Sequence, residues 1–352
     1  MSRLRSIVRT FGPAAEVVGT EEYRPARPGP GEVAVRMLLA AVNPSDLVTI
    51  SGAYASRTVL PFVPGFEGVG VVEETGPDVR DLQPGQRVLP LGSAGAWQQT
   101  KITDGRWCLP VRPELNDEQA ATAYINPLTA HLMVRQYVLT AGAEVVVVNA
   151  AASAIGRMLI RMLNRAGIRP VAVVRHPRGL ARLAGTELTA AVCTADRAAG
   201  EAVRELTGGR GAGVVLDAVG GAEGAELGRV LATGGTLVHY GLLSGRPLPA
   251  ELPAARPDVR LVLFRLRDWV HHVHTTDPDR LTEALAEVYE LVLDGTAASQ
   301  VAGVYPLSAV RGHCGGTPNR AGRAGAAAPH RLTGRLPRRH SARRATRLCS
   351  RP

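Results

Sequence analysis

The sequence predicts an α/β protein in which an irregular, mostly β lobe precedes a doubly wound parallel sheet. Up to about residue 122, short β-type runs alternate with Pro/Gly clusters such as residues 28–31. From about residue 144 onward, apolar strands, small-residue turns and amphipathic helices follow one another repeatedly. Strands that alternate with helix-length segments predict a parallel sheet, because each helix returns the chain to the edge where the next strand starts. The length of 352 residues is enough for two such domains.

Candidate strands occur in both halves of the chain. In the first half they are residues 32–37, 68–73 and 87–91. In the second half they are residues 144–149, 171–174, 191–193, 214–218, 236–240 and 260–264. We therefore expect domains at residues 1–122 and 123–296, with residues 297–311 completing the first domain and residues 312–352 forming a separate tail.

The net charge of +10 comes from the end of the chain. Residues 312–352 hold ten arginines and no acidic residue, which leaves 31 basic and 31 acidic groups in residues 1–311. The body of the protein is therefore neutral. Its fourteen aromatic residues are too few for rows of base-stacking side chains. We expect a small-molecule substrate and do not expect nucleic acid as a partner.

The cysteines and the amino terminus indicate in which cellular compartment the protein is expected. Cys108, Cys193, Cys314 and Cys349 show no spacing typical of a disulfide framework or of a structural metal site. The first residues lack the apolar core of a signal peptide, and no apolar run approaches the roughly 18 residues of a membrane helix. We expect a soluble, cytoplasmic protein without a bound metal.

A buried-strand run at residues 145–148 leads through small residues into the amphipathic segment 157–163. The turn between them is a G-x-G-x-x-G pattern with small residues in place of the first two glycines. Such a turn lets backbone N–H groups approach a pyrophosphate, where the helix dipole favours negative charge. The pattern predicts the cofactor-binding turn of a Rossmann domain at Ala151, Ser153, Ala154, Ile155 and Gly156. A turn of this composition can also serve only to pack a helix on a sheet.

Arg175 follows the next predicted strand, where the residue that discriminates between dinucleotides lies. A carboxylate there would bind a free ribose 2′-hydroxyl, whereas an arginine pairs with a 2′-phosphate. The sequence therefore favours NADPH over NADH, with Arg178 as a further candidate contact. The alternative is that Arg175 is one of many solvated surface arginines.

Tyr240, Gly241 and Leu242 follow a later predicted strand. In an open α/β sheet the ligand lies beyond the carboxyl ends of the strands, so these residues are expected beside the nicotinamide half of the cofactor. They can also be plain turn residues, with Gly241 supplying a positive φ.

Several motifs resemble those of the zinc-independent medium-chain dehydrogenase/reductases, which pair a GroES-like β lobe with a Rossmann domain. They are Asn-Pro-Ser-Asp at 43–46, Ser-Gly-Ala-Tyr at 51–54, Val-Pro-Gly-Phe-Glu-Gly-Val-Gly at 63–70, Asn-Pro-Leu-Thr-Ala at 126–130, Val-Val-Arg at 173–175 and His-Tyr-Gly-Leu-Leu-Ser at 239–244. They are similar to quinone oxidoreductases and, more closely, to mitochondrial-type 2-enoyl thioester reductases. The resemblance covers about residues 30–310.

The resemblance implies NADPH-dependent reduction of the C=C bond of an enoyl-CoA or enoyl-ACP, by hydride transfer to Cβ. It implies that Tyr54 donates a proton or stabilises the enolate, since a phenol keeps its proton at neutral pH. Asn43 and Thr129 are implied as cofactor-side contacts, and Phe264 and Trp269 as walls of an acyl pocket. From the residues alone, Tyr54 can be a loop tyrosine, Asn43 and Thr129 turn or cap residues, and the two aromatics ordinary core.

Zinc chemistry is disfavoured by the residues at two positions. Zinc-dependent relatives keep a liganding histidine and a cysteine where this chain has Phe66 and Asn43, and phenylalanine cannot bind a metal. The four-cysteine structural zinc lobe is missing as well. His271, His272 and His274 match no metal motif, and we interpret them as part of a surface helix. We therefore expect hydride transfer to an acceptor that needs no metal.

Other functions remain open at this point. The same cofactor could serve a quinone or small-enone substrate, because nothing in the sequence identifies an acyl carrier. The chain could also be an inactive remnant, or bind nucleic acid through its basic tail. The resemblance further implies a homodimer formed through the sheet edge of the second domain.

The resemblance breaks after about residue 311. Relatives continue with an amphipathic helix and a last strand, whereas residues 312–352 are rich in Arg, Ala, Gly and Pro with almost no apolar periodicity. Acidic residues and pattern disappear at one point, in a chain with forty arginines and one lysine. We interpret the tail as out-of-frame translation of GC-rich DNA, with a genuine basic arm as the alternative.

Overall fold

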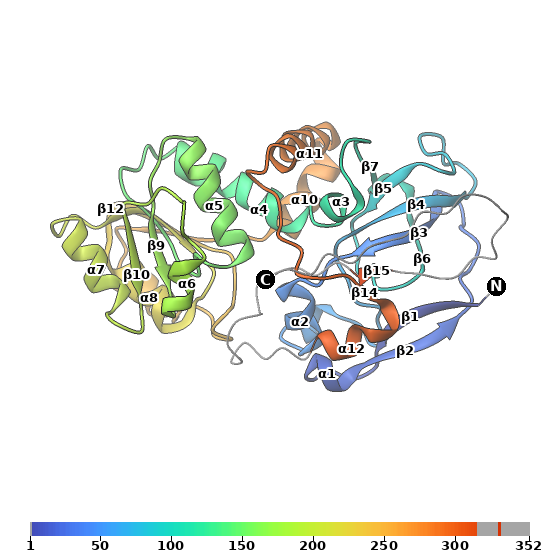
Figure 1. The fold of residues 1–352 in the computed structure, drawn as a ribbon, viewed down its shortest axis with the longest axis horizontal. Helices are drawn as coiled ribbons and strands as arrows, with labels where there is room; N and C mark the ends of the chain where they lie inside the picture. The colour runs from blue at the N-terminus through green and yellow to red at the C-terminus, as the bar shows by residue number, and fades with distance from the viewer. Residues whose placement is uncertain (1, 315–329, 332–352) are drawn as a thin grey trace.

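The computed structural model describes residues 2–314 and 330–331, which form two lobes with a band of helices between them (Figure 1). The first lobe is built on a mostly antiparallel sheet and the second on a parallel sheet. One hydrophobic cluster runs across both lobes, from Leu89 and Leu91 in the first to Val146 and Val148 in the second. The α/β fold class that the sequence predicts is therefore confirmed.

The first lobe contains a seven-stranded sheet. Its strands in spatial order are β14 (Tyr305–Pro306), β15 (His330–Arg331), β3 (Glu32–Ala40), β4 (Gly68–Thr75), β5 (Arg87–Pro90) and β7 (Cys108–Pro110), with β6 (Thr100–Asp104) paired to β3. A separate antiparallel ribbon joins β1 (Arg3–Val8) to β2 (Val18–Tyr23). Val33, Val35 and Met37 alternate along β3 and are buried in the core of this lobe, as the period of a strand requires.

Short helical segments close this lobe. They are α1 (Ala14–Val17), α2 (Pro44–Ile50), α3 (Asp117–Ala121) and α12 (Val310–His313), with 3-10 turns η1 (Ala55–Arg57), η2 (Gly105–Trp107) and η4 (Leu307–Ala309). Pro44 suits the first turn of α2, where its missing N–H costs no hydrogen bond. Leu307 and Val310 are buried in the core of the first lobe, so the chain returns there after the second lobe is complete.

The second lobe contains six parallel strands. Their spatial order is β10 (Ala190–Cys193), β9 (Val171–Val174), β8 (Val146–Val148), β11 (Ala212–Asp217), β12 (Leu231–His239) and β13 (Arg260–Leu263). β8 and β9 are buried on both faces, which explains why they are continuous apolar runs rather than alternating ones. All the strands predicted from the sequence correspond to strands of the structure, whereas β1, β2, β6 and β7 were not predicted.

Helices cover both faces of the parallel sheet. α5 (Ala154–Arg165) shares a core with Val146 and Val148, while α7 (Ala199–Leu206) and α8 (Gly221–Arg229) share one with Val147. The shorter helices are α6 (Pro177–Ala181) and α9 (Leu252–Ala255). The band between the lobes holds α4 (Ile125–Met133) with its π-helical continuation η3 (Val134–Leu139), α10 (Leu266–Thr276) and α11 (Pro278–Leu293) (Figure 1).

His271, His272 and His274 lie on the helix α10, and two of them contact the first lobe. The ring centroid of Trp107 in η2 lies 3.7 Å from that of His274 and 4.9 Å from that of His271. This stack is one of the contacts that join the lobes.

The predictions for the tail fall largely outside the described residues. Within residues 312–352, the structure describes Gly312 to Cys314 at the end of α12 and the pair His330–Arg331, which pairs with Ala40 and Leu39 of β3. In the part of the chain that is described, no helix is long and apolar enough to cross a membrane.

Gly156 is required for the close approach of α5 to the turn before it. A Cβ atom there would lie 2.6 Å from the carbonyl oxygens of Ala150 and Ala151, which are backbone atoms and cannot move aside cheaply. We expect Gly156→Ala to lower the free energy of unfolding by about 1–3 kcal/mol, measured by urea denaturation.

The control for this variant is Gly312→Ala on α12. Gly312 is exposed, with nothing within 4 Å of its Cβ position, so we expect no loss of stability. Equal stability of the two variants would show that the turn tolerates a side chain.

Candidate active site

The turn after β8 has the geometry of an anion-binding helix start. Ala150 adopts a positive φ of 45°, and the Oγ of Ser153 accepts a hydrogen bond of 3.1 Å from the N–H of Gly156. Ser153 is therefore the N-cap of α5. Ala151 is fully buried and its N–H donates to Val173 of β9, which fixes the turn against the sheet. Of the predicted turn residues, Ser153, Ala154 and Ile155 remain partly accessible.

A row of polar side chains crosses the carboxyl ends of three neighbouring strands. Asp217 at the end of β11 accepts hydrogen bonds from Asn149 Nδ2 at 2.6 Å and from His239 Nδ1 at 2.7 Å. Its carboxylate also accepts from the backbone N–H groups of Val219 and Gly220, directly before α8. The Oδ1 of Asn149 in turn accepts from the N–H of Ala218 at 2.8 Å. The row thus ties β8, β11, β12 and the start of α8 together.

The charge of Asp217 is supported by these donors. The residue is completely buried, which by itself raises the pKa of a carboxyl group. The hydrogen bonds from His239, Asn149 and Gly220 outweigh burial and hold the pKa of Asp217 below its ordinary value. An ionised Asp217 accepts only, so the proton of the His239 ring lies on Nδ1. Sequence reasoning did not assign this row, although each residue lies at the last or next-to-last position of a predicted strand.

Tyr240, Gly241 and Leu242 follow β12 on the same edge of the sheet. The Tyr240 hydroxyl is buried and has no hydrogen-bond partner within the described residues, and burial raises its pKa. Gly241 does not supply a positive φ, so that expectation is wrong. Glycine is needed there because a Cβ atom would lie 2.6 Å from the carbonyl oxygen of Ala218. The turn therefore packs closely on the neighbouring strand end.

Arg175 lies directly after β9 and is exposed. Burial and the negative charges of Asp217 and Glu226 raise the pKa of Glu223, in the first turn of α8. The positive charge of Arg175 is close enough to oppose this rise. Arg178 lies in the short helix α6. The positive charge of Arg175 is thus placed at the carboxyl edge, beside the phosphate-type turn.

In the first lobe, Asn43 is part of a buried polar cluster. Asn43 is 1% exposed, and its Nδ2 donates to Glu67 Oε2 at 2.8 Å. Glu67 Oε1 accepts from the backbone N–H groups of Tyr124 at 2.7 Å and Ile125 at 2.9 Å, at the start of α4. Asp46 accepts from the N–H groups of Asn43 at 2.7 Å and Phe66 at 3.1 Å. The cluster therefore joins the start of α2, the loop before β4 and the start of α4.

The two carboxyl groups of this cluster have no arginine or lysine partner among the described residues. Burial raises the pKa of Glu67 to about 7 despite its three donors. Burial, assisted by the nearby Glu67, likewise raises the pKa of Asp46 to about 7. The Oδ1 atom of Asn43 is buried without a hydrogen-bond partner in the described part of the chain. Sequence reasoning selected Asn43 but missed Glu67 and Asp46 as its partners.

The other predicted residues lie at four separate positions along the chain. Tyr54 precedes η1, is half-buried and stacks under the guanidinium of Arg57 at 4.9 Å. Thr129 is buried within α4. Phe264 is 6% exposed, belongs to the core and meets the ring of Tyr137 edge-on. Trp269 on α10 is half-buried, with Arg280 5.8 Å from its ring centroid.

Zinc-dependent relatives carry metal ligands at two positions that are Asn43 and Phe66 in this chain. The first residue is hydrogen-bonded within the protein, and the second cannot bind a metal. Asn43 is hydrogen-bonded to Glu67, and Phe66 has no donor atom in its side chain. No group of three or more His, Cys, Asp or Glu residues is placed to hold a metal ion in residues 2–314.

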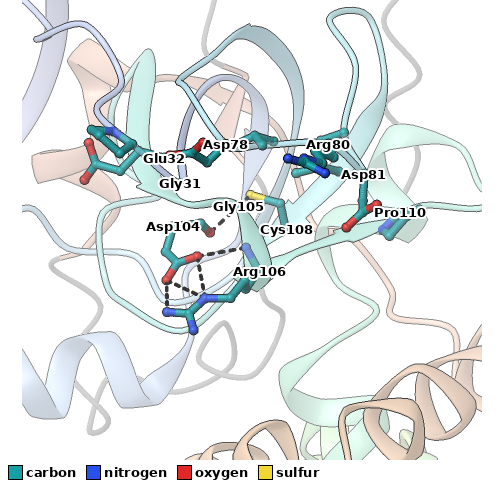
Figure 2. Close-up of a pocket in the computed structure, with 13 residues that line it drawn as sticks. Gly31, Glu32, Asp78, Arg80, Asp81, Asp104, Gly105, Arg106, Cys108 and Pro110 are labelled. Carbon is teal, nitrogen blue, oxygen red and sulfur yellow. Dashed lines mark hydrogen bonds and ion pairs between the residues drawn. The ribbon is translucent and has the colours of Figure 1, made fainter.

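A cavity lies in the first lobe, and its lining does not include these residues. It has a volume of about 580 Å³ and is bordered by the start of β3, the loop before β5 and the turn η2. Figure 2 shows the paired Asp104 and Arg106 and the sulfur of Cys108 at its wall. None of the residues predicted for the site lines this cavity.

The fold and the strand-end turn define the class as a two-lobed enzyme of the dinucleotide-binding type. Two family profiles match: "alcohol dehydrogenase GroES-like domain" over residues 29–113 and "zinc-binding dehydrogenase" over residues 154–289. The chain is 30% identical to the mitochondrial enoyl-[acyl-carrier-protein] reductase of Bos taurus over 316 residues, which are 87% of this chain and 83% of that protein. It is 32% identical to the Caenorhabditis elegans enzyme of the same description, over 69% of this chain and 71% of that protein.

Solved structures with the same two-lobed fold are found among quinone oxidoreductases. A Bacillus thuringiensis protein assigned as an NADPH:quinone reductase superposes with a TM-score of 0.86 and 32% identity, covering 95% of this chain and all of that one. The Escherichia coli quinone oxidoreductase has the same fold, with a TM-score of 0.83 and 22% identity over 94% of this chain and all of that one. The chain belongs to the medium-chain dehydrogenase/reductase superfamily, and it is an oxidoreductase.

We expect Asp217→Asn to lower the free energy of unfolding by about 2–4 kcal/mol at pH 7, because the new amide group would face N–H donors. The pKa of Asp217 is lower in the folded state, so its contribution is complete above the unfolded pKa of about 3.9 and is lost as the pH falls through the folded value. Urea denaturation of both proteins between pH 8 and pH 3 measures this difference.

The matched control is Asp196→Asn, an exposed aspartate of the same lobe whose carboxylate makes no hydrogen bond in the described residues. We expect a change within about 0.5 kcal/mol. If the difference between Asp217→Asn and the unaltered protein stayed constant down to pH 3, Asp217 would not be the ionised acceptor of the row.

Proposed function

We propose that the protein reduces the C=C bond of a 2-enoyl thioester with NADPH. The observation that carries this proposal is the edge of the parallel sheet, where a capped helix start, Arg175 and one buried, unpartnered polar atom lie. A second buried, unpartnered polar atom lies in the first lobe. The unpartnered atoms are Asn43 Oδ1 and the Tyr240 hydroxyl. Buried polar groups without partners are rare in native structures and are typical of places where a ligand completes the hydrogen bonds.

The residues present fit a dinucleotide. The backbone N–H groups at the start of α5 suit a pyrophosphate, and Gly156 and Gly241 keep the backbone free of side chains there. The exposed guanidinium of Arg175 suits a ribose 2′-phosphate. Asn43, Thr129 and the Tyr240–Leu242 turn are proposed for the nicotinamide half. When bound, NADPH supplies the hydride that Cβ of the substrate receives.

Tyr54 is proposed to complete the reaction. Hydride addition at Cβ leaves negative charge on the thioester oxygen, and Cα must then receive a proton. Tyr54 carries a half-buried phenol whose hydroxyl makes no hydrogen bond in the described residues, so its proton is available to the enolate oxygen or to Cα. The relatives described as enoyl-[acyl-carrier-protein] reductases, at about 30% identity over most of the chain, support an enoyl thioester as substrate.

A quinone or small enone is the second candidate substrate. The solved relative with 32% identity and a TM-score of 0.86 is described as an NADPH:quinone reductase. Such an acceptor takes the hydride and a proton without a thioester, so the same cofactor site would serve it. Phe264 and Trp269 are proposed as part of the substrate pocket in either case.

The dimer that the resemblance implies stays a prediction. β13 ends the six-stranded sheet, and Leu263 on it is 58% exposed. An apolar side chain on an edge strand is what pairing with a second copy would cover.

We expect the protein to oxidise NADPH with crotonyl-CoA, followed at 340 nm, and Tyr54→Phe to lower kcat about 10²-fold or more while NADPH affinity is unchanged. The control is Tyr289→Phe, whose hydroxyl donates to the carbonyl of Pro110 at 3.4 Å. We expect its kcat to be unchanged. Full activity of Tyr54→Phe would remove Tyr54 from the mechanism, and turnover of a quinone but not of crotonyl-CoA would favour the second candidate.

We expect Arg175→Ala to weaken NADPH binding about 10- to 100-fold, since a charged hydrogen bond contributes roughly 1.5–3 kcal/mol, and to leave NADH binding nearly unchanged. Quenching of intrinsic fluorescence by each dinucleotide measures the two affinities. Arg169→Ala, which removes an exposed arginine paired with Glu187, is the matched control. Equal loss for NADPH and NADH would contradict a contact with the 2′-phosphate.

A further inference from the structure

The buried carboxylate of Glu67 determines which way the Asn43 side chain can face. Glu67 Oε1 is occupied by the N–H groups of Tyr124 and Ile125, at 2.7 and 2.9 Å. The other oxygen, Oε2, is left to Asn43. An ionised carboxylate only accepts hydrogen bonds, so Asn43 must turn its NH₂ group toward Oε2 and its Oδ1 away. That Oδ1 atom is the buried acceptor without a partner in the described residues.

We propose that Glu67 is a positioning residue that sets the polarity of the Asn43 amide, so that Oδ1 accepts a hydrogen bond from a hydroxyl or amide N–H on the nicotinamide half of the dinucleotide. This inference rests on the proposed NADPH site. It adds a residue that does not itself touch the ligand. Asp46 fixes the backbone at the same point, because its carboxylate accepts a hydrogen bond of 2.7 Å from the N–H of Asn43.

Protonation of Glu67 would reverse the amide. A proton on Oε2 makes that atom a donor, and Asn43 would then turn Oδ1 toward Glu67 and present NH₂ to the ligand. The titratable groups that face this cluster are Asp46 on α2, Tyr124 before α4 and, next to Asp46, Cys314 after α12. Among the described residues, Arg267 on α10 is the cation that acts on Tyr124, where it opposes the rise in the pKa of the phenol that burial causes. Burial places the pKa of Glu67 at about 7, so the change of polarity falls in an accessible pH range.

A charge-swap cycle tests the proposal. In Glu67→Gln the new amide still accepts from Tyr124 and Ile125, but its NH₂ faces Asn43 and forces Oδ1 inward. We expect NADPH affinity to fall about tenfold or more, because the NH₂ group of Asn43 then faces the hydroxyl or N–H donor of the ligand. In the double variant Glu67→Gln/Asn43→Asp, one oxygen of the carboxylate introduced at position 43 accepts from the amide introduced at position 67, and its other oxygen again accepts from the ligand. The net charge of the pair is unchanged.

We expect the double variant to bind NADPH within about threefold of the unaltered protein, measured by fluorescence quenching without substrate. If Glu67 contributed only to folding, the two substitutions would add, and the double variant would bind no better than Glu67→Gln. That result would overturn the proposal, as would unchanged affinity in Glu67→Gln. Glu118→Gln, an exposed glutamate on α3, is the matched control. Absence of NADPH binding by the unaltered protein would overturn the proposed function together with the inference.

A second measurement needs no variant and covers the case in which Glu67→Gln fails to fold. We expect the Kd of the unaltered protein to rise several-fold from pH 8 to pH 6 for both NADPH and NADH, since Glu67 gains its proton in this range together with Asp46, which contacts the backbone N–H of Asn43. A 2′-phosphate titrates near pH 6 and affects NADPH only. Loss of affinity confined to NADPH, or no loss, would overturn the proposal.

Discussion

The carboxylate of Asp217 is the interaction on which the edge of the parallel sheet depends. It is completely buried, and its charge is balanced by donors from Asn149, His239 and the backbone before α8 rather than by a cation. Because those donors come from different segments, removing the acceptor would leave several buried N–H groups unpaired at once. The turn that starts α5 follows Asn149 directly, so the turn proposed to bind the pyrophosphate is built on a fixed strand end.

In the first lobe, too, buried carboxyl groups accept hydrogen bonds from several segments of the chain. Glu67 collects N–H groups from the start of α4 and the amide of Asn43, and Asp46 collects those of Asn43 and Phe66. In both lobes a buried carboxyl group accepts hydrogen bonds from segments that are far apart in the chain, and polar atoms nearby have no partner within the described residues. Burying such an atom costs free energy, which a ligand that supplies the missing hydrogen bond would return.

Sequence patterns predicted the second lobe well because each of its strands is a short apolar run between turn residues, and parallel strands buried on both faces leave that signature. The same patterns missed β1, β2, β6 and β7 of the first lobe. In β2, for example, Val18 is the only buried residue. They also assigned the wrong reason to Gly241, since close packing against Ala218 can be seen only when the two strand ends lie together.

The sequence by itself determined the α/β fold class, the order of the strands along the chain, the small-residue turn at 150–156 and the placement of Arg175 at a strand end. These are local properties, set by periodicity and residue size within about twenty positions. Only the tertiary structure decided that Asp217 is ionised and holds three strand ends, and that Glu67 orients Asn43. Hydrogen-bond partners 22 to 68 residues apart make those contacts, and no local pattern encodes them.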